Sequence, residues 1–90
     1  MEENTVLSER LVELRDLFGV TDAQIGRALG TSEYFVRRWH SGESAPDLAR
    51  FTQLCRYYGA PADYLLGLSS YLPFDMRERL LAQQSTVGFT

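Results

Sequence analysis

Two adjacent arginines, Arg37 and Arg38, carry the chemistry that is easiest to assign in this chain. A guanidinium is always charged, and its planar set of donors makes paired hydrogen bonds to a phosphate or to the edge of guanine. If the segment around them is a helix, Val36 and Trp39 share its inward face. The outward positions are then Glu33, Tyr34, Arg37 and Arg38. This arrangement favours binding to nucleic acid.

Catalysis and metal binding have no comparable set of residues. The chain has one histidine, His40, and one cysteine, Cys55, so it offers neither a catalytic histidine–cysteine set nor the ligands of a zinc site. Cys55 lies in an apolar helical pattern that is typical of a buried small hydrophobe. His40 is expected to make a hydrogen bond or to lie at the surface. Phosphate-binding loops and nucleophile elbows are absent from the sequence. We therefore expect no enzymatic activity, no cofactor and no metal.

Residues 21–42 supply the elements that would position the two arginines. Thr21 is a good helix N-cap, and Gln24 three residues later completes a capping box. Gly30 ends this first helix where a positive φ is expected, and Ser32 caps the next one. Two short helices joined by a tight turn form a helix-turn-helix, whose second helix usually enters the major groove of DNA.

The other segments up to residue 68 also have helical patterns, without the alternation of a strand. One stripe of residues 5–18 holds Leu7, Leu11, Leu14 and Phe18. Asp47 opens a further helix, whose apolar face is Leu48, Phe51, Leu54, Cys55 and Tyr58. A short last helix follows Pro61 and carries Tyr64, Leu65 and Leu66. A chain of 90 residues can build one core, so we expect an all-α, compact five-helix domain over residues 1–68.

Residues 69–90 are expected to form a C-terminal extension. Its apolar residues recur in a short amphipathic segment, expected to be an extra helix: Tyr71, Leu72, Phe74, Met76, Leu80 and Leu81. A lone helix of this length is marginal in water, so it must pack on something. Two alternatives stay open: a sixth helix folded onto its own domain, and a contact between two copies in a homodimer. Residues 83–90 have the composition of a frayed tail.

The charge balance is unusual for a nucleic-acid-binding protein. The net charge is −3 and the isoelectric point is about 5.0, which is not the footprint of a DNA-binding protein as a whole. The charges are unevenly distributed along the chain. Residues 33–60 carry three acids and four arginines, whereas residues 1–32 carry six acids and three arginines. We expect a modest, salt-sensitive affinity for double-stranded DNA.

The sequence also indicates the cellular location of the protein. No apolar run approaches the ~18 residues that a membrane-spanning helix needs, and no secretory signal is present. We expect a cytoplasmic protein that does not bind membranes.

Residues 7–68 resemble the Cro/lambda-repressor-type helix-turn-helix family, also called XRE-like. The matching segments are LVELRDLFGVT, IGRALGTS, VRRWHSG, Pro46 and LCRYYGAPADYLLG, and they cover about two thirds of the chain. The resemblance implies a lambda-repressor-like fold. It also implies a regulator of transcription, of the phage- or mobile-element-type repressors that bind a two-fold operator as a homodimer.

The resemblance assigns roles to individual residues. Base contacts in similar proteins come from the first two positions after the helix cap and from the position five beyond the first. These positions fall on Glu33, Tyr34 and Arg38. Phosphate contacts are expected from Thr21, Gln24, Ser32, Arg37 and Ser41. Arg37 has the alternative of an i,i+4 pair with Glu33.

Three residues depart from the family pattern. Asp22 stands where glutamine is common, and a carboxylate cannot donate a hydrogen bond to a phosphate. His40 stands where glutamate is common, which removes a frequent ion-pair partner. Gly26 replaces a common alanine, which weakens the helix by up to ~1 kcal/mol and leaves more room against the next helix.

A second class of function stays open. The acidic balance and the neighbouring rings of Tyr34 and Phe35 would also suit a protein-interaction module, such as an antitoxin or an adaptor. An antirepressor or other protein partner would then bind the same surface. Phe35 is expected to lie partly in the core, with contact to a thymine methyl group as the alternative.

Overall fold

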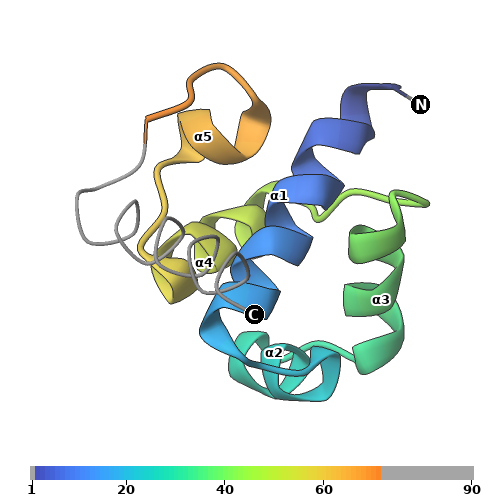
Figure 1. Cartoon of the computed structure of the whole chain (residues 1–90). Helices are drawn as coiled ribbons and strands as arrows, with labels where there is room; N and C mark the ends of the chain where they lie inside the picture. The colour runs from blue at the N-terminus through green and yellow to red at the C-terminus, as the bar shows by residue number, and fades with distance from the viewer. Residues whose placement is uncertain (1, 72–90) are drawn as a thin grey trace, which may run out of the picture.

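Five helices make up the part of the chain that the structure describes, residues 2–71 of a computed structural model. They are α1 (Glu2–Phe18), α2 (Asp22–Leu29), α3 (Glu33–Ser41), α4 (Leu48–Tyr58) and α5 (Ala62–Leu66) (Figure 1). No strand occurs within residues 2–71. The predicted all-α, five-helix fold is confirmed. The first helix begins at Glu2 rather than at residue 5, and glutamate is favoured near a helix N-terminus.

The predicted apolar stripes meet in one core. Its fully buried members come from all five of these helices and are Leu11, Leu14, Ile25, Val36, Leu54 and Leu65. Trp39 and Tyr64 are buried beside them, and the ring of Phe18 packs edge-on against that of Tyr58, with centroids 5.0 Å apart. Burial of large side chains of this kind stabilises the fold by about 1.5–3 kcal/mol each.

Two leucines that were expected on apolar faces lie at the surface instead. Leu48 is 80% exposed, because it is the first residue of α4 and the inward face of that helix begins one turn later, with Phe51. Leu66, the last residue of α5, is half-exposed.

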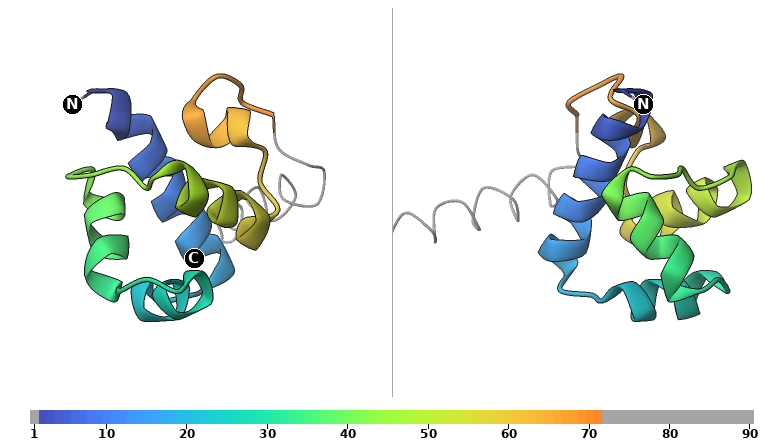
Figure 2. Two further views of the ribbon diagram at one scale, coloured as in Figure 1. Left: turned by 180° about the vertical axis from the view of Figure 1, so that it is seen from behind. Right: turned by 90° about the vertical axis from the view of Figure 1, so that its right-hand side faces the viewer.

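The helices place α3 at one edge of the molecule. α2 packs closely on α3, and α1 packs on both α3 and α5. In Figure 1, α5 lies on the far side of α1 from α3, and the second view in Figure 2 shows α3 standing clear of α5. One long face of α3 is therefore left without a helix against it. Within residues 2–71, no helix is both long enough and apolar enough to span a membrane.

Arg10 ties the end of the described chain to α1. Its guanidinium donates to the carbonyl oxygens of Tyr64 and Ser69, the latter at 2.9 Å, and lies 4.2 Å from the centroid of the Tyr64 ring. The Tyr64 hydroxyl in turn donates to Glu13 at 2.8 Å. The chain just after α5 is thus held on the side of the domain away from α3.

Candidate nucleic-acid interface

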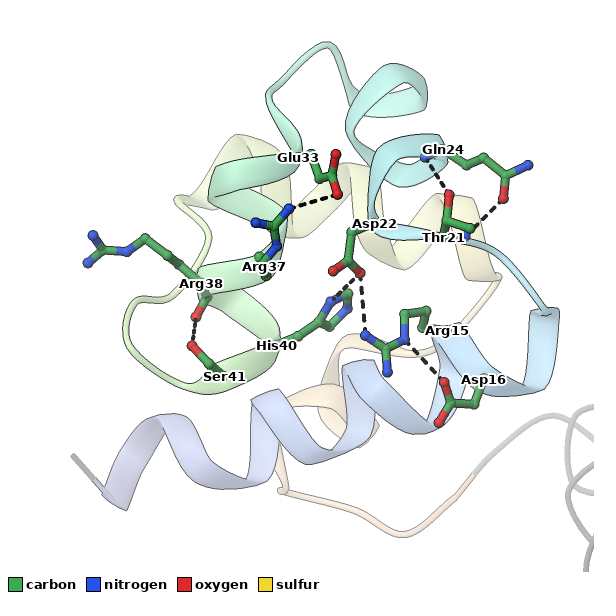
Figure 3. Close-up of polar contacts among 10 residues, drawn as sticks. All are labelled: Arg15, Asp16, Thr21, Asp22, Gln24, Glu33, Arg37, Arg38, His40 and Ser41. Carbon is green, nitrogen blue, oxygen red and sulfur yellow. Dashed lines mark hydrogen bonds and ion pairs between the residues drawn. The ribbon is translucent and has the colours of Figure 1, made fainter.

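The N-termini of α2 and α3 are fixed by the caps that the sequence predicts. The Gln24 backbone N–H donates to Thr21 Oγ1 at 3.1 Å, and the Thr21 N–H donates to Gln24 Oε1 at 2.9 Å (Figure 3). Ser32 Oγ accepts from the Phe35 N–H at 3.3 Å. Each capping oxygen acts as an acceptor, so the Thr21 hydroxyl and the Gln24 amide keep their own donors for a phosphate.

The predicted division of α3 into two faces is confirmed. Val36 and Trp39 are buried, whereas Glu33, Tyr34 and Arg37 are exposed. Arg38, the fourth residue predicted to point outward, is only partly exposed. The expectation for Phe35 is wrong, because this side chain is 50% exposed. It lies on the flank of α3 beside a groove, and its ring packs edge-on against Tyr34 with centroids 5.4 Å apart.

Both arginines of α3 have partners within the chain. Arg37 Nη2 lies 2.7 Å from Glu33 Oε2, which is the i,i+4 pair that the sequence offered as an alternative (Figure 3). Arg38 Nη1 donates to the Tyr34 hydroxyl at 3.1 Å, and Arg38 Nε lies 3.8 Å from Glu43 Oε1. The contact of Arg38 with Glu43 was not predicted, because it depends on how the loop after α3 folds back.

Ser41 is the candidate phosphate contact whose donor is already in use. Its hydroxyl donates to the Arg38 carbonyl oxygen at 3.1 Å and accepts from the Glu43 N–H at 3.4 Å (Figure 3). A hydrogen bond from Ser41 to a phosphate therefore requires its hydroxyl to rotate away from α3.

Two hollows flank Arg38. One, of about 240 Å³, is lined by Tyr34, Arg37, Arg38, Ser41 and Glu43. A larger groove of about 500 Å³ runs between α3 and α4, and is lined by Thr31, Phe35, Arg38, Trp39, Ser44, Ala45, Asp47 and Arg50. Sequence reasoning did not name Arg50 as a site residue. The one available signal was its place in the segment with an excess of arginine.

A partly buried polar cluster behind α3 joins three helices. His40 Nδ1 lies 3.0 Å from Asp22 Oδ1, and Arg15 Nη1 lies 3.4 Å from the same oxygen (Figure 3). Arg15 Nε also pairs with Asp16 at 3.1 Å. The His40 side chain is only 6% exposed. The family pattern has an acid at position 40, on α3, whereas here the acid is Asp22, on α2. The departures at positions 22 and 40 therefore compensate each other.

Stability should fall in mild acid because of this cluster. Burial lowers the pKa of His40 below its ordinary 6.5 and outweighs Asp22, which raises it. Below pH 6.5 the unfolded chain then binds more protons than the folded chain, so the contribution of His40 is complete above that pH and declines as the pH falls toward the folded pKa. The melting temperature, followed by circular dichroism from pH 7.5 down to about pH 5, should drop more in the wild type than in His40→Asn.

The variant His40→Asn is the matched control, because its amide can donate to Asp22 as Nδ1 does but does not titrate. An equal slope in both proteins would contradict the role of His40. The acid sensitivity would then arise elsewhere in the protein.

Other chemistry is not evident in the described part of the chain. No group of three or more histidine, cysteine, aspartate or glutamate side chains is placed to hold a metal ion. Burial raises the pKa of the half-buried Cys55 thiol, which keeps it protonated and unreactive at neutral pH.

The dimer contacts predicted from sequence fall mostly beyond what the structure describes. Tyr71 is described and is 64% exposed. Leu72, Phe74, Met76, Leu80 and Leu81 lie outside residues 2–71.

Comparison with known proteins gives one match. A family model described as a helix-turn-helix domain matches residues 6–65, which include α2 and α3 and most of the core. The comparisons with curated proteins and with solved structures found no match.

Proposed function

Because the chain belongs to the helix-turn-helix domain family, a family of DNA-binding regulators, we propose that it is a sequence-specific regulator of transcription. The observation that carries this proposal is the free outward face of α3, which presents two arginines on a helix fixed by a cap at its start and a buried tryptophan near its end. A helix of this kind is the element that reads base edges in the major groove.

We assign direct base contacts to Glu33, Tyr34 and Arg38. Arg38 is suited to paired hydrogen bonds with guanine, Glu33 to accepting from a cytosine amino group, and Tyr34 to contact with a thymine methyl group. Contacts to the DNA backbone are assigned to a second set, which is Thr21, Gln24, Ser32, Arg37 and Ser41. Arg50 joins this set, because its side chain lines the groove that also contains Arg38.

We further propose a repressor of the phage or mobile-element type, acting as a homodimer on a two-fold operator and occluding a promoter. Residues 1–68 would bind DNA, and apolar residues from Tyr71 to Leu81 would join the two copies. We also propose that a protein partner, such as an antirepressor, controls its binding to DNA.

Truncation after Leu68 should halve the mass measured by light scattering, because it removes the proposed dimer contact. Circular dichroism serves as the control that the truncated domain still folds. A full-length chain that already has the mass of a monomer, or a truncated chain that keeps the mass of a dimer, would contradict this contact.

Chemical-shift mapping with a duplex of mixed sequence tests the DNA-binding surface. The amide signals expected to move are those of α3 and of the first turn of α2. Single-stranded DNA of equal length is the control for simple attraction to an anion. Shifts confined to α5, or none at all, would speak against the proposal.

One observation favours a second function. The exposed rings of Tyr34 and Phe35 lie on or beside the face assigned to DNA, and aromatic residues are enriched in protein interfaces. A protein-interaction module, such as an antitoxin or adaptor, would use this pair as its anchor. A tight partner that co-purifies with the protein and competes with DNA would support this second function.

A further inference from the structure

The arginines on the outward face of α3 lie close to acidic residues of the same chain. Arg37 pairs with Glu33, Arg38 Nη1 donates to the Tyr34 hydroxyl, and Arg38 Nε lies 3.8 Å from the Glu43 carboxylate, beyond hydrogen-bond distance. Tyr34 lies one turn before Arg38, whereas Glu43 comes from the loop that follows α3. A DNA-binding surface with free arginines would attract any phosphate, but here each guanidinium already has a carboxylate close by.

The backbone fixes Glu43 in this position. Its N–H donates to the Arg38 carbonyl oxygen at 3.1 Å and to Ser41 Oγ at 3.4 Å, so the loop folds back over the end of α3. The Glu43 side chain is 65% exposed and lines the hollow of about 240 Å³ beside Arg38. Its carboxylate therefore faces any molecule that enters the hollow.

We propose that Glu43 is a specificity-determining residue. On random DNA, Arg38 stays paired with the Glu43 carboxylate, and it leaves this pair only to contact the correct base. This inference rests on the proposed function. A single phosphate offers Arg38 an interaction of the same kind as its pair with Glu43, so little is gained by exchanging them. Paired hydrogen bonds to guanine O6 and N7 discriminate for that base, whereas an exposed ion pair such as that with Glu43 contributes little, so the exchange becomes favourable there.

The variant Glu43→Gln tests this role through two dissociation constants, one for a duplex selected from a random library and one for a random duplex. Because Arg38 is freed, affinity for the random duplex should rise about 5-fold and affinity for the selected duplex about 2-fold or less, so that specificity falls. The log–log salt dependence for random DNA should steepen by about 0.9, which corresponds to one added phosphate contact.

Two controls separate this role from simple repulsion of DNA by a carboxylate. In an Arg38→Ala background, Glu43→Gln should no longer change the ratio of the two constants. Asp63→Asn removes an equal charge from α5, which packs on α1 and α4, and should leave the ratio unchanged.

Four outcomes would overturn the inference. Equal gains on both duplexes, or a change of ratio that persists without Arg38, would reduce Glu43 to a general repulsive charge. Two dissociation constants that both stay unchanged, in a protein that does select a duplex, would refute the inference alone. A wild type that selects no duplex would refute the proposed function and this inference together.

Discussion

Arg38→Ala should weaken binding to a selected duplex by about 1–3 kcal/mol, or roughly 5- to 150-fold, and should relax specificity at one base position. The reason is the loss of paired hydrogen bonds to one guanine. The melting temperature should barely change, because Arg38 contacts the exposed Tyr34 hydroxyl and the exposed Glu43 carboxylate, and such surface pairs contribute about 0–1 kcal/mol. Fluorescence anisotropy on a panel of single-base variants measures the loss at each position.

The adjacent variant Arg37→Ala is the control for this experiment. Arg37 is assigned to a phosphate, so its removal should weaken binding about equally on every sequence and lower the salt dependence. If Arg38→Ala behaves in the same way, Arg38 contacts the DNA backbone rather than a base, and the assignment of base contacts is wrong.

Gly26→Ala should lower the melting temperature by up to about 16 °C, although alanine is the better helix former. A Cβ atom at position 26 would lie 2.9 Å from the Thr31 carbonyl oxygen and 3.2 Å from the Glu33 nitrogen. Both are backbone atoms of the turn into α3, so they cannot rotate away. Overpacking of this kind costs about 1–3 kcal/mol against a gain in helix propensity of up to about 1 kcal/mol, and each kcal/mol is worth about 4–8 °C in a domain of this size.

The variant Ala28→Gly gives the matching measure of helix propensity alone, because Ala28 is exposed on the same helix. Thermal unfolding of both variants by circular dichroism completes the comparison. A rise in melting temperature for Gly26→Ala would show that the turn moves aside freely, and the close approach of α2 to α3 would then not be required by the fold.

Local features of this fold were predictable because their causes lie within a few residues. The capping box of Thr21 and Gln24, the cap at Ser32 and the inward pair Val36 and Trp39 each follow from spacing along one helix. The family resemblance added the expected roles of Glu33, Tyr34 and Arg38, and these roles remain proposals.

Features that depend on several elements were not predictable from spacing. The sequence suggested that Gly26 leaves room, whereas the backbone of the turn occupies that space. The cluster of Asp22, Arg15 and His40 needs three helices to meet, and the contact of Arg38 with Glu43 needs the loop to fold back. Phe35 lies on the flank of α3, where its burial is decided by the position of α4 rather than by helical periodicity.

The most direct test of DNA recognition is selection of bound duplexes from a random-sequence library at near-physiological salt. We expect an enriched inverted repeat whose half-sites lie about one helical turn apart, as two copies of α3 in successive major grooves require. A single enriched half-site would retain recognition but contradict the dimer. No enrichment at all would contradict sequence-specific binding to DNA and would favour a protein partner on the face of Tyr34 and Phe35.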